Sequence, residues 1–166
     1  MTTDAADGRF HISVVCTGNI CRSPMAAIML RAAIDDAGLG DRVRVTSAGT
    51  GPWHAGGPAH ELTQRVLADN GYLTEHVAHQ ITAAELSTAD LVLAADRGHV
   101  AALRRMNRRA SRSTDRIVLF RSFDPNAGEH DLPDPWGGPQ GEFVAVFEMV
   151  RAALPGIIAE VRRQVG

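Results

Sequence analysis

The sequence predicts a single three-layer α/β domain, in which a four-stranded parallel sheet carries helices on both faces. The chain has 166 residues, of which 45% are hydrophobic, enough for one compact core. Short apolar runs rich in β-branched residues alternate with stretches of helical period, and no repeat or linker interrupts them. This alternation is typical of parallel sheets, whose ligands lie beyond the carboxyl ends of the strands.

Each element has its own signal in the sequence. Aliphatic and β-branched runs predict strands at residues 10–16, 42–49, 89–95 and 116–120. Apolar residues at helical spacing predict helices at residues 24–39, 58–71, 98–109 and 141–165. Pro155 predicts a kink or break in the last helix. We expect residues 1–9, which are polar, to be a flexible N-terminus ahead of one domain at 10–166.

Composition and charge exclude several classes of function. A formal net charge of −2 provides no overall basic field for nucleic acid or an anionic membrane. All 17 positive charges are arginines, so a lysine-containing nucleotide loop is excluded. No apolar stretch has the length of a signal peptide or membrane span, and we expect a cytoplasmic protein. The histidines show no ligand spacing and the two close cysteines supply too few thiolates for a structural zinc, so we expect no metal.

The stretch "CTGNICRS", which begins at Cys16, joins the first strand to the first helix. Gly18 and Asn19 are the residue types that most readily take left-handed backbone angles, so this loop can turn several N–H groups inward. Such a ring of amides binds a tetrahedral oxyanion. We expect Ser23 to cap the following helix and Pro24 to occupy its first position.

Positive charge completes this anion site. The guanidinium of Arg22 matches two oxygens of a phosphoryl group, and the helix N-terminus adds a partial positive charge. The same field favours the thiolate of Cys16, which is the nucleophilic form. A cysteine that ends a buried strand is ordinarily an inert small hydrophobic residue, but packing explains none of the loop residues. We therefore interpret the loop as binding an anion and activating a nucleophile.

These residues resemble the C-x5-R-S phosphate loop of the low-molecular-weight protein tyrosine phosphatases, especially actinobacterial members. The segments "TSAGTGPWHAG", "GYLTEHVAHQIT", "LVLAADRGHV", "RSFDP" and "PDPWGG" are similar to family segments in the same order. The resemblance implies that phosphotyrosine in proteins is hydrolysed through a phosphocysteine intermediate without a cofactor. Cys16 would be the nucleophile, Arg22 would bind phosphate, and Asp134 would be the general acid and base.

The resemblance also assigns supporting residues. The phosphate loop would comprise residues 16–23, with Thr17, Gly18, Asn19, Ile20, Cys21 and Ser23 beside the catalytic pair, and phosphate, sulfate or vanadate are its expected ligands. Ser47 and His76 would hold Asn19 through side-chain hydrogen bonds, with Asp96 joining them; the alternative is that they are ordinary structural residues. Trp53 and Trp136 would line the substrate pocket.

The sequence departs from the family pattern beside the acid. Pro133 precedes Asp134 where the family usually has an acidic residue, and Trp136 and Gly137 replace a pair of tyrosines. Ile20 favours phosphotyrosine over phosphoarginine, because similar phosphoarginine phosphatases carry a small threonine there.

Other interpretations remain open from the sequence. Cys21 either fills space under the loop or forms a reversible disulfide with Cys16. An arsenate reductase that uses an external thiol would need a similar loop. A non-catalytic phosphoprotein-binding module is the third alternative, although such a module is expected to lack the nucleophile or the acid.

Overall fold

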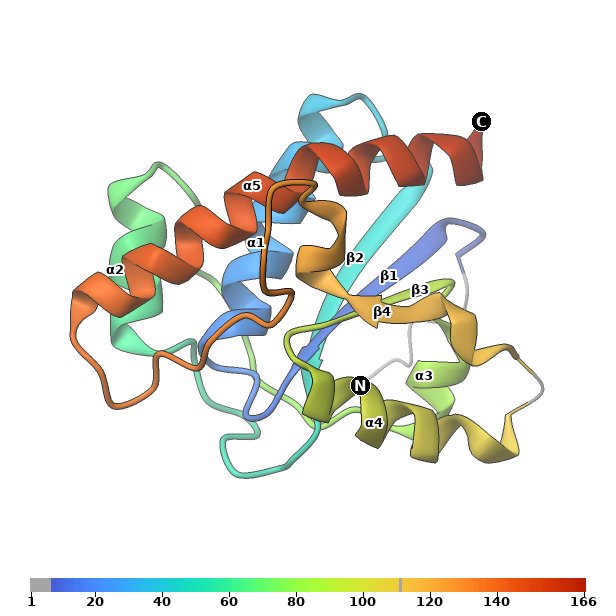
Figure 1. Ribbon diagram of the computed structural model, residues 1–166, viewed down its shortest axis with the longest axis horizontal. Helices are drawn as coiled ribbons and strands as arrows, with labels where there is room; N and C mark the ends of the chain where they lie inside the picture. Colours follow the sequence, from blue (N-terminus) through green and yellow to red (C-terminus); the bar gives the residue numbers. More distant parts are fainter. Residues whose placement is uncertain (1–6, 111) are drawn as a thin grey trace.

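The computed structural model describes residues 7–110 and 112–166, which form a four-stranded parallel sheet in the order β2-β1-β3-β4 (Figure 1). The strands are β1 (Phe10–Cys16), β2 (Val43–Gly49), β3 (Leu91–Ala94) and β4 (Ile117–Leu119). All four predicted strands are therefore confirmed, with β3 and β4 shorter than predicted. Most of the expected flexible N-terminus lies outside the described residues.

Helices cover both faces of the sheet, as predicted (Figure 1). They are α1 (Arg22–Asp36), α2 (Glu61–Asp69), α3 (Ala83–Thr88), α4 (Arg97–Met106) and α5 (Gln140–Val165), with short 3₁₀ turns η1 (Asn107–Arg109), η2 (Thr114–Arg116) and η3 (Phe120–Phe123). Helix α3 was not predicted from the sequence, because six residues are too few to show a helical period. Thr82 caps this short helix by accepting the N–H of Glu85.

Of the kink or break predicted at Pro155, the break is wrong, because α5 continues through the proline as one helix of 26 residues. Leu154 and Ile157 are buried on either side of the proline. Apolar burial on both sides offsets the backbone hydrogen bond that the proline removes, so the helix is not interrupted.

The start of α1 also differs from the prediction. The helix begins at Arg22, Cys21 occupies the N-cap position, and no side chain caps the first turn. Ser23 is therefore not the cap; its hydroxyl lies 3.0 Å from the sulfur of Cys16. Pro24 is the third residue of the helix rather than the first. The helix thus starts inside the phosphate loop, and its first N–H groups carry no side-chain cap.

Two apolar cores hold the three layers together. The larger core packs α1, α2 and α5 against one face of the sheet, with Met29 and Phe147 among its fully buried side chains. The smaller core packs α3 and α4 against the other face through Leu86 and Leu103. In the described part of the chain, no helix is both long enough and apolar enough to cross a membrane.

The sheet brings separate segments together at its carboxyl edge. Cys16, the last residue of the central strand β1, is in register with Gly49, the last residue of β2. On its other side β1 pairs with β3, which leads directly into α4. The predicted nucleophile therefore lies between the end of β2 and the start of α4.

Candidate active site

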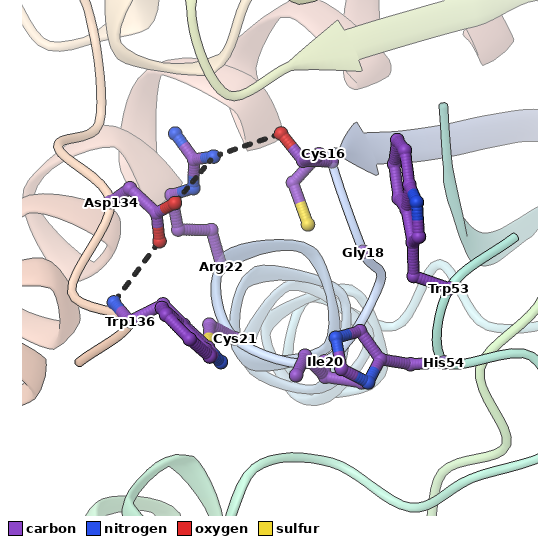
Figure 2. Close-up of a pocket in the computed structure, with 10 residues that line it drawn as sticks. Cys16, Gly18, Ile20, Cys21, Arg22, Trp53, His54, Asp134 and Trp136 are labelled. Atoms are coloured by element: carbon purple, nitrogen blue, oxygen red, sulfur yellow. Dashed lines mark hydrogen bonds and ion pairs between the residues drawn. The ribbon is translucent and has the colours of Figure 1, made fainter. Parts of the chain in front are cut away.

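A pocket of about 210 Å³ opens at this carboxyl edge (Figure 2). Its lining consists of Cys16, Thr17, Gly18, Ile20, Cys21, Arg22, Trp53, His54, Asp134 and Trp136. All of these except His54 are residues that the sequence singled out. The pocket thus brings a cysteine and an arginine of the phosphate loop together with a carboxylate from a segment more than a hundred residues later.

Asn19 holds the phosphate loop in its bent conformation. Its φ of 57° is the only positive φ among the described residues other than glycine, and its side chain is fully buried. The amide nitrogen donates to the hydroxyls of Ser23, at 2.8 Å, and Ser47, at 3.0 Å. The predicted contact with Ser47 is confirmed. These bonds offset the cost of a left-handed backbone, which is unfavourable for a side chain larger than glycine.

Two histidines complete the support of Asn19. His76 lies with Nε2 2.7 Å from the backbone carbonyl oxygen of Asn19, so the predicted pairing of the two residues is confirmed, with the backbone rather than the side chain of Asn19 as the partner. Burial lowers the pKa of His76, which favours a neutral ring that donates this hydrogen bond. The backbone N–H of His79 donates to Asn19 Oδ1 at 3.0 Å. A backbone donor leaves no mark in the sequence, so this contact was not predicted.

The two cysteines are free thiols in different environments. Cys16 Sγ lies 3.0 Å from Ser23 Oγ, at the N-terminal end of α1 and on the pocket wall. For Cys21, burial raises the pKa to about 12, so its thiol stays protonated at neutral pH. Only Cys16 therefore combines an anion-stabilising surrounding with a place beside the pocket.

Arg22 is buried, and its guanidinium is fixed on one side. Nη1 donates to Asp96 Oδ2 and to the carbonyl oxygen of Leu132, both at 2.9 Å. Although burial opposes ionisation, the hydrogen bond from Arg22 contributes to lowering the pKa of Asp96, which therefore stays charged. Asp96 supports Arg22 and caps α4. The prediction that it joins Ser47 and His76 at Asn19 is wrong. Nη2 faces the pocket, 3.8 Å from Asp134 Oδ2.

His99 links α4 to the phosphate loop. Its Nε2 lies 2.7 Å from Thr17 Oγ1, and its Nδ1 accepts the backbone N–H of Asp96. Burial lowers the pKa of His99, which favours the neutral ring that this arrangement requires. This role of His99 was not predicted from the sequence. Its position three residues after the capping aspartate was the available signal, since this is the spacing of a reciprocal helix cap.

Asp134 comes from the segment between η3 and α5, and its side chain is 55% exposed. Its Oδ1 accepts the N–H of Trp136 at 3.1 Å. Trp53 and Trp136 lie on opposite sides of the pocket, and both are largely exposed (Figure 2). The carboxylate therefore faces the same opening that the two indole rings flank.

Gly49 shapes the loop from behind, which gives a first prediction. A Cβ at this position would lie 2.6 Å from the carbonyl oxygen of Thr17 and 3.1 Å from the backbone nitrogen of Asn19. Because both atoms are backbone, Gly49→Ala is expected to displace the loop and lower kcat/KM for an aryl phosphate by about tenfold or more. Steady-state kinetics would measure this. Gly128→Ala, where a Cβ meets nothing within 4 Å, is the control; equal activities would contradict the prediction.

Within residues 7–110 and 112–166, no group of three histidine, cysteine, aspartate or glutamate side chains is placed to hold a metal ion. The chemistry that this pocket offers is that of a thiol, a guanidinium and a carboxylate.

The comparisons with known proteins agree with this chemistry. Residues 11–166 match the family model for low molecular weight phosphotyrosine protein phosphatase. The chain is 48% identical over 158 residues to a low molecular weight protein-tyrosine-phosphatase of Streptomyces coelicolor, covering 94% of this chain and 96% of that one. It is 47% identical over 149 residues to low molecular weight protein-tyrosine phosphatase A of Mycobacterium tuberculosis, covering 89% and 88%.

Solved structures show the same fold. The crystal structure of YfkJ from Bacillus subtilis superposes with a TM-score of 0.88 at 29% identity, covering 98% of this chain and all of that one. The match extends over the whole sheet and its helices rather than over the loop alone. The chain therefore belongs to the low molecular weight phosphotyrosine protein phosphatase family and is a phosphatase of that class.

Proposed function

We propose that this enzyme hydrolyses phosphotyrosine in proteins through a phosphocysteine intermediate, with Cys16 as nucleophile, Arg22 as phosphate ligand and Asp134 as general acid and base. The observation that carries the proposal is that Asp134, distant in sequence, lines the same pocket as Cys16 and Arg22 of the phosphate loop. A cysteine in a loop of amides, an arginine and a carboxylate at the open side are the groups that this reaction needs.

The phosphate loop would bind the phosphoryl group as a dianion. Nη1 of Arg22 is already engaged by Asp96 and Leu132, which leaves the pocket-facing side of the guanidinium for phosphoryl oxygens. The uncapped start of α1 adds N–H donors and a partial positive charge. Inorganic phosphate, sulfate and vanadate are tetrahedral oxyanions whose oxygens are arranged like those of a phosphoryl group. We expect all three to bind there.

In the first step, the sulfur of Cys16 would form a bond to phosphorus while the bond from phosphorus to the tyrosine oxygen breaks. Asp134 would give its proton to that oxygen, so that a neutral phenol leaves. In the second step, the same carboxylate would take a proton from water, whose oxygen attacks phosphorus and releases the thiolate. Ser23, 3.0 Å from the sulfur, is placed to donate a hydrogen bond to the thiolate.

The pocket walls favour an aromatic substrate. Trp53 and Trp136 flank the opening, where they can pack against a phenyl ring, and Ile20 adds an aliphatic surface. The phosphoprotein substrate class follows from the family; phosphotyrosine is the finer proposal, and Ile20 supports it over phosphoarginine. The expected cytoplasmic location remains a prediction.

The two rival functions are less well supported. The sequence has only two cysteines, both in the loop, so an arsenate reductase would have to take its electrons from an external thiol. A binding module that lacks catalysis is expected to lack the nucleophile or the acid, whereas both line this pocket. Consumption of an external thiol that depends on arsenate would favour the reductase.

Trapping the covalent intermediate would test the proposal. Wild-type protein is mixed with a ³²P-phosphotyrosine peptide in a metal chelator, quenched in acid within milliseconds and digested. The label is expected in the peptide that contains Cys16, because the phosphorus–sulfur bond forms before water attacks. Turnover in the chelator without any labelled protein would contradict the phosphocysteine intermediate.

A further inference from the structure

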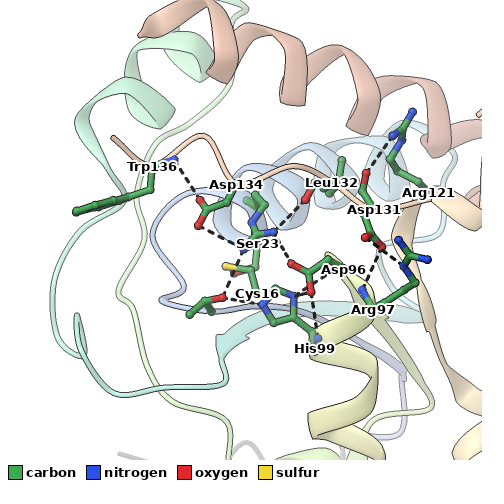
Figure 3. Close-up of polar contacts among 12 residues, drawn as sticks. Cys16, Ser23, Asp96, Arg97, His99, Arg121, Asp131, Leu132, Asp134 and Trp136 are labelled. Atoms are coloured by element: carbon green, nitrogen blue, oxygen red, sulfur yellow. Dashed lines mark hydrogen bonds and ion pairs between the residues drawn. The ribbon is translucent and has the colours of Figure 1, made fainter. Parts of the chain in front are cut away.

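We propose that Asp131 is a positioning residue for the general acid, because it docks the segment that carries Asp134 onto the N-terminus of α4. This inference rests on the proposed role of Asp134. We call residues 129–138 the acid segment. Figure 3 shows Asp131 between Arg97 and Arg121, on the same stretch of chain as Asp134.

The acid itself is held weakly. Asp134 is more than half exposed, and its one hydrogen bond among the described residues, from the N–H of Trp136, stays within the acid segment. Its ion pair with Arg22 spans 3.8 Å, which is long for a directed contact. These contacts alone do not fix the carboxylate relative to the phosphate loop, so its position depends on how the rest of the segment is anchored.

The anchor lies two to three residues before the acid. Asp131 Oδ1 accepts the backbone N–H of Arg97, the first residue of α4, at 3.1 Å, and Oδ2 lies 3.3 Å from Arg97 Nε. A carboxylate at a helix N-terminus is stabilised by the helix dipole as well as by the hydrogen bond. The carbonyl oxygen of Asp131 also accepts Arg121 Nη1 at 3.0 Å. Asp131 is thus held through both its side chain and its backbone.

The next residue joins this anchor to the catalytic arginine. The N–H of Leu132 donates to the carbonyl oxygen of Ala95 at 2.8 Å, and the carbonyl of Leu132 accepts Arg22 Nη1 at 2.9 Å. Because Asp96 at the start of α4 binds the same Nη1, one helix terminus fixes both the phosphate ligand and the acid segment.

Two prolines restrict the backbone between the anchored residues and the acid. The sequence after the anchor is Pro133, Asp134 and Pro135. Each proline ring fixes its own φ, and Pro135 also restricts the backbone of Asp134 before it. With Leu132 anchored, few free torsions remain between the anchor and the carboxylate. Losing the anchor is therefore expected to move the acid rather than to loosen only the surface.

This role predicts a kinetic signature that a purely structural role would not give. A misplaced acid slows the departure of a poor leaving group, but it matters less for a good one, which leaves without full protonation. Asp131→Ala is expected to lower kcat/KM by about tenfold or more for phenyl phosphate, and by much less for 4-nitrophenyl phosphate. Competitive inhibition by inorganic phosphate is expected to stay within about twofold of wild type, because the loop amides are untouched.

The experiment compares wild type, Asp131→Ala, Asp131→Asn, Asp134→Asn and the double variant Asp131→Ala/Asp134→Asn on both substrates. Asp131→Asn keeps an oxygen for the Arg97 N–H and is expected to be intermediate. In the double variant, the ratio of the two kcat/KM values is expected to equal that of Asp134→Asn alone, because Asp131 acts through Asp134. Glu129→Ala is the matched control. Glu129 is 81% exposed, and its carboxylate faces the same arginine, 4.0 Å from Nη2, without touching the α4 backbone.

The outcomes separate the inference from the function on which it rests. If Asp134→Asn steepens the dependence on the leaving group and Asp131→Ala does not, only the positioning role is overturned. Equal losses on both substrates, or the same change of ratio for Glu129→Ala, would also overturn it. If Asp134→Asn leaves the ratio unchanged, the role of Asp134 fails and the inference fails with it.

Discussion

Replacing Cys16 with serine is expected to reduce kcat/KM for a phosphotyrosine peptide by about 10⁵-fold or more, the scale seen when a covalent enzyme loses its nucleophile. The loop places Ser23, Arg22 and the start of α1 around this sulfur, which give it a hydroxyl at 3.0 Å, a positive charge and uncapped N–H groups. A serine hydroxyl at the same place remains protonated at neutral pH and is a poor nucleophile. Initial rates in a metal chelator would measure the loss.

Two further measurements make this result specific to the sulfur of Cys16. The Cys16→Ser variant is expected to keep binding phosphate, because the loop amides and Arg22 remain. Calorimetry would measure this binding. Cys21→Ser is the matched variant, since it changes the other buried thiol of the same loop. With its pKa raised to about 12, Cys21 is neutral, and its replacement is expected to cost far less activity. Measurable turnover by Cys16→Ser would contradict the nucleophile assignment.

The second large effect is expected at Asp134. Asp134→Asn keeps an oxygen for the N–H of Trp136 but removes the proton donor and base, so kcat is expected to fall by about 10² to 10³-fold. Because 4-nitrophenolate is a good leaving group, the first step with 4-nitrophenyl phosphate should suffer less than the second. Phosphocysteine is therefore expected to accumulate, and stopped-flow absorbance should show a burst of nitrophenolate approaching one equivalent per enzyme.

Wild-type enzyme measured under the same conditions is the control for the burst. A variant that loses activity on 4-nitrophenyl phosphate without a larger burst than wild type would contradict a role in the second step. An unchanged kcat would contradict a role of Asp134 in both steps, and another group would then have to supply the proton.

Much of the fold and site could be predicted because the signals were local. Apolar runs of strand length located all four strands, and their alternation with helices indicated a parallel sheet. The phosphate loop could be predicted because glycine, asparagine and arginine occur within eight residues, and each is suited to anion binding by its own backbone or side chain. The start of α1 was misplaced because Ser23 and Pro24 match a helix cap locally, whereas the hydroxyl faces the sulfur of Cys16 instead.

Contacts between distant segments could not be predicted in the same way. Arg22 meets Asp96 and Leu132 across 74 and 110 residues of sequence, and Thr17 meets His99 across 82. The family resemblance correctly predicted that Ser47 and His76 contact Asn19, but not that His76 reaches the backbone carbonyl of Asn19. Neither hydropathy nor spacing specifies which of several polar groups lies opposite another.

By itself, the sequence determined the chemistry of this protein: a cysteine, an arginine and an amide-rich turn whose properties follow from residue type and immediate neighbours. The tertiary structure alone decided the geometry, by bringing the start of α4 beside the phosphate loop and docking the acid segment on it. The physical reason is that backbone preferences act over a few residues, whereas the packing of helices on a sheet fixes distances between segments that are far apart in the chain.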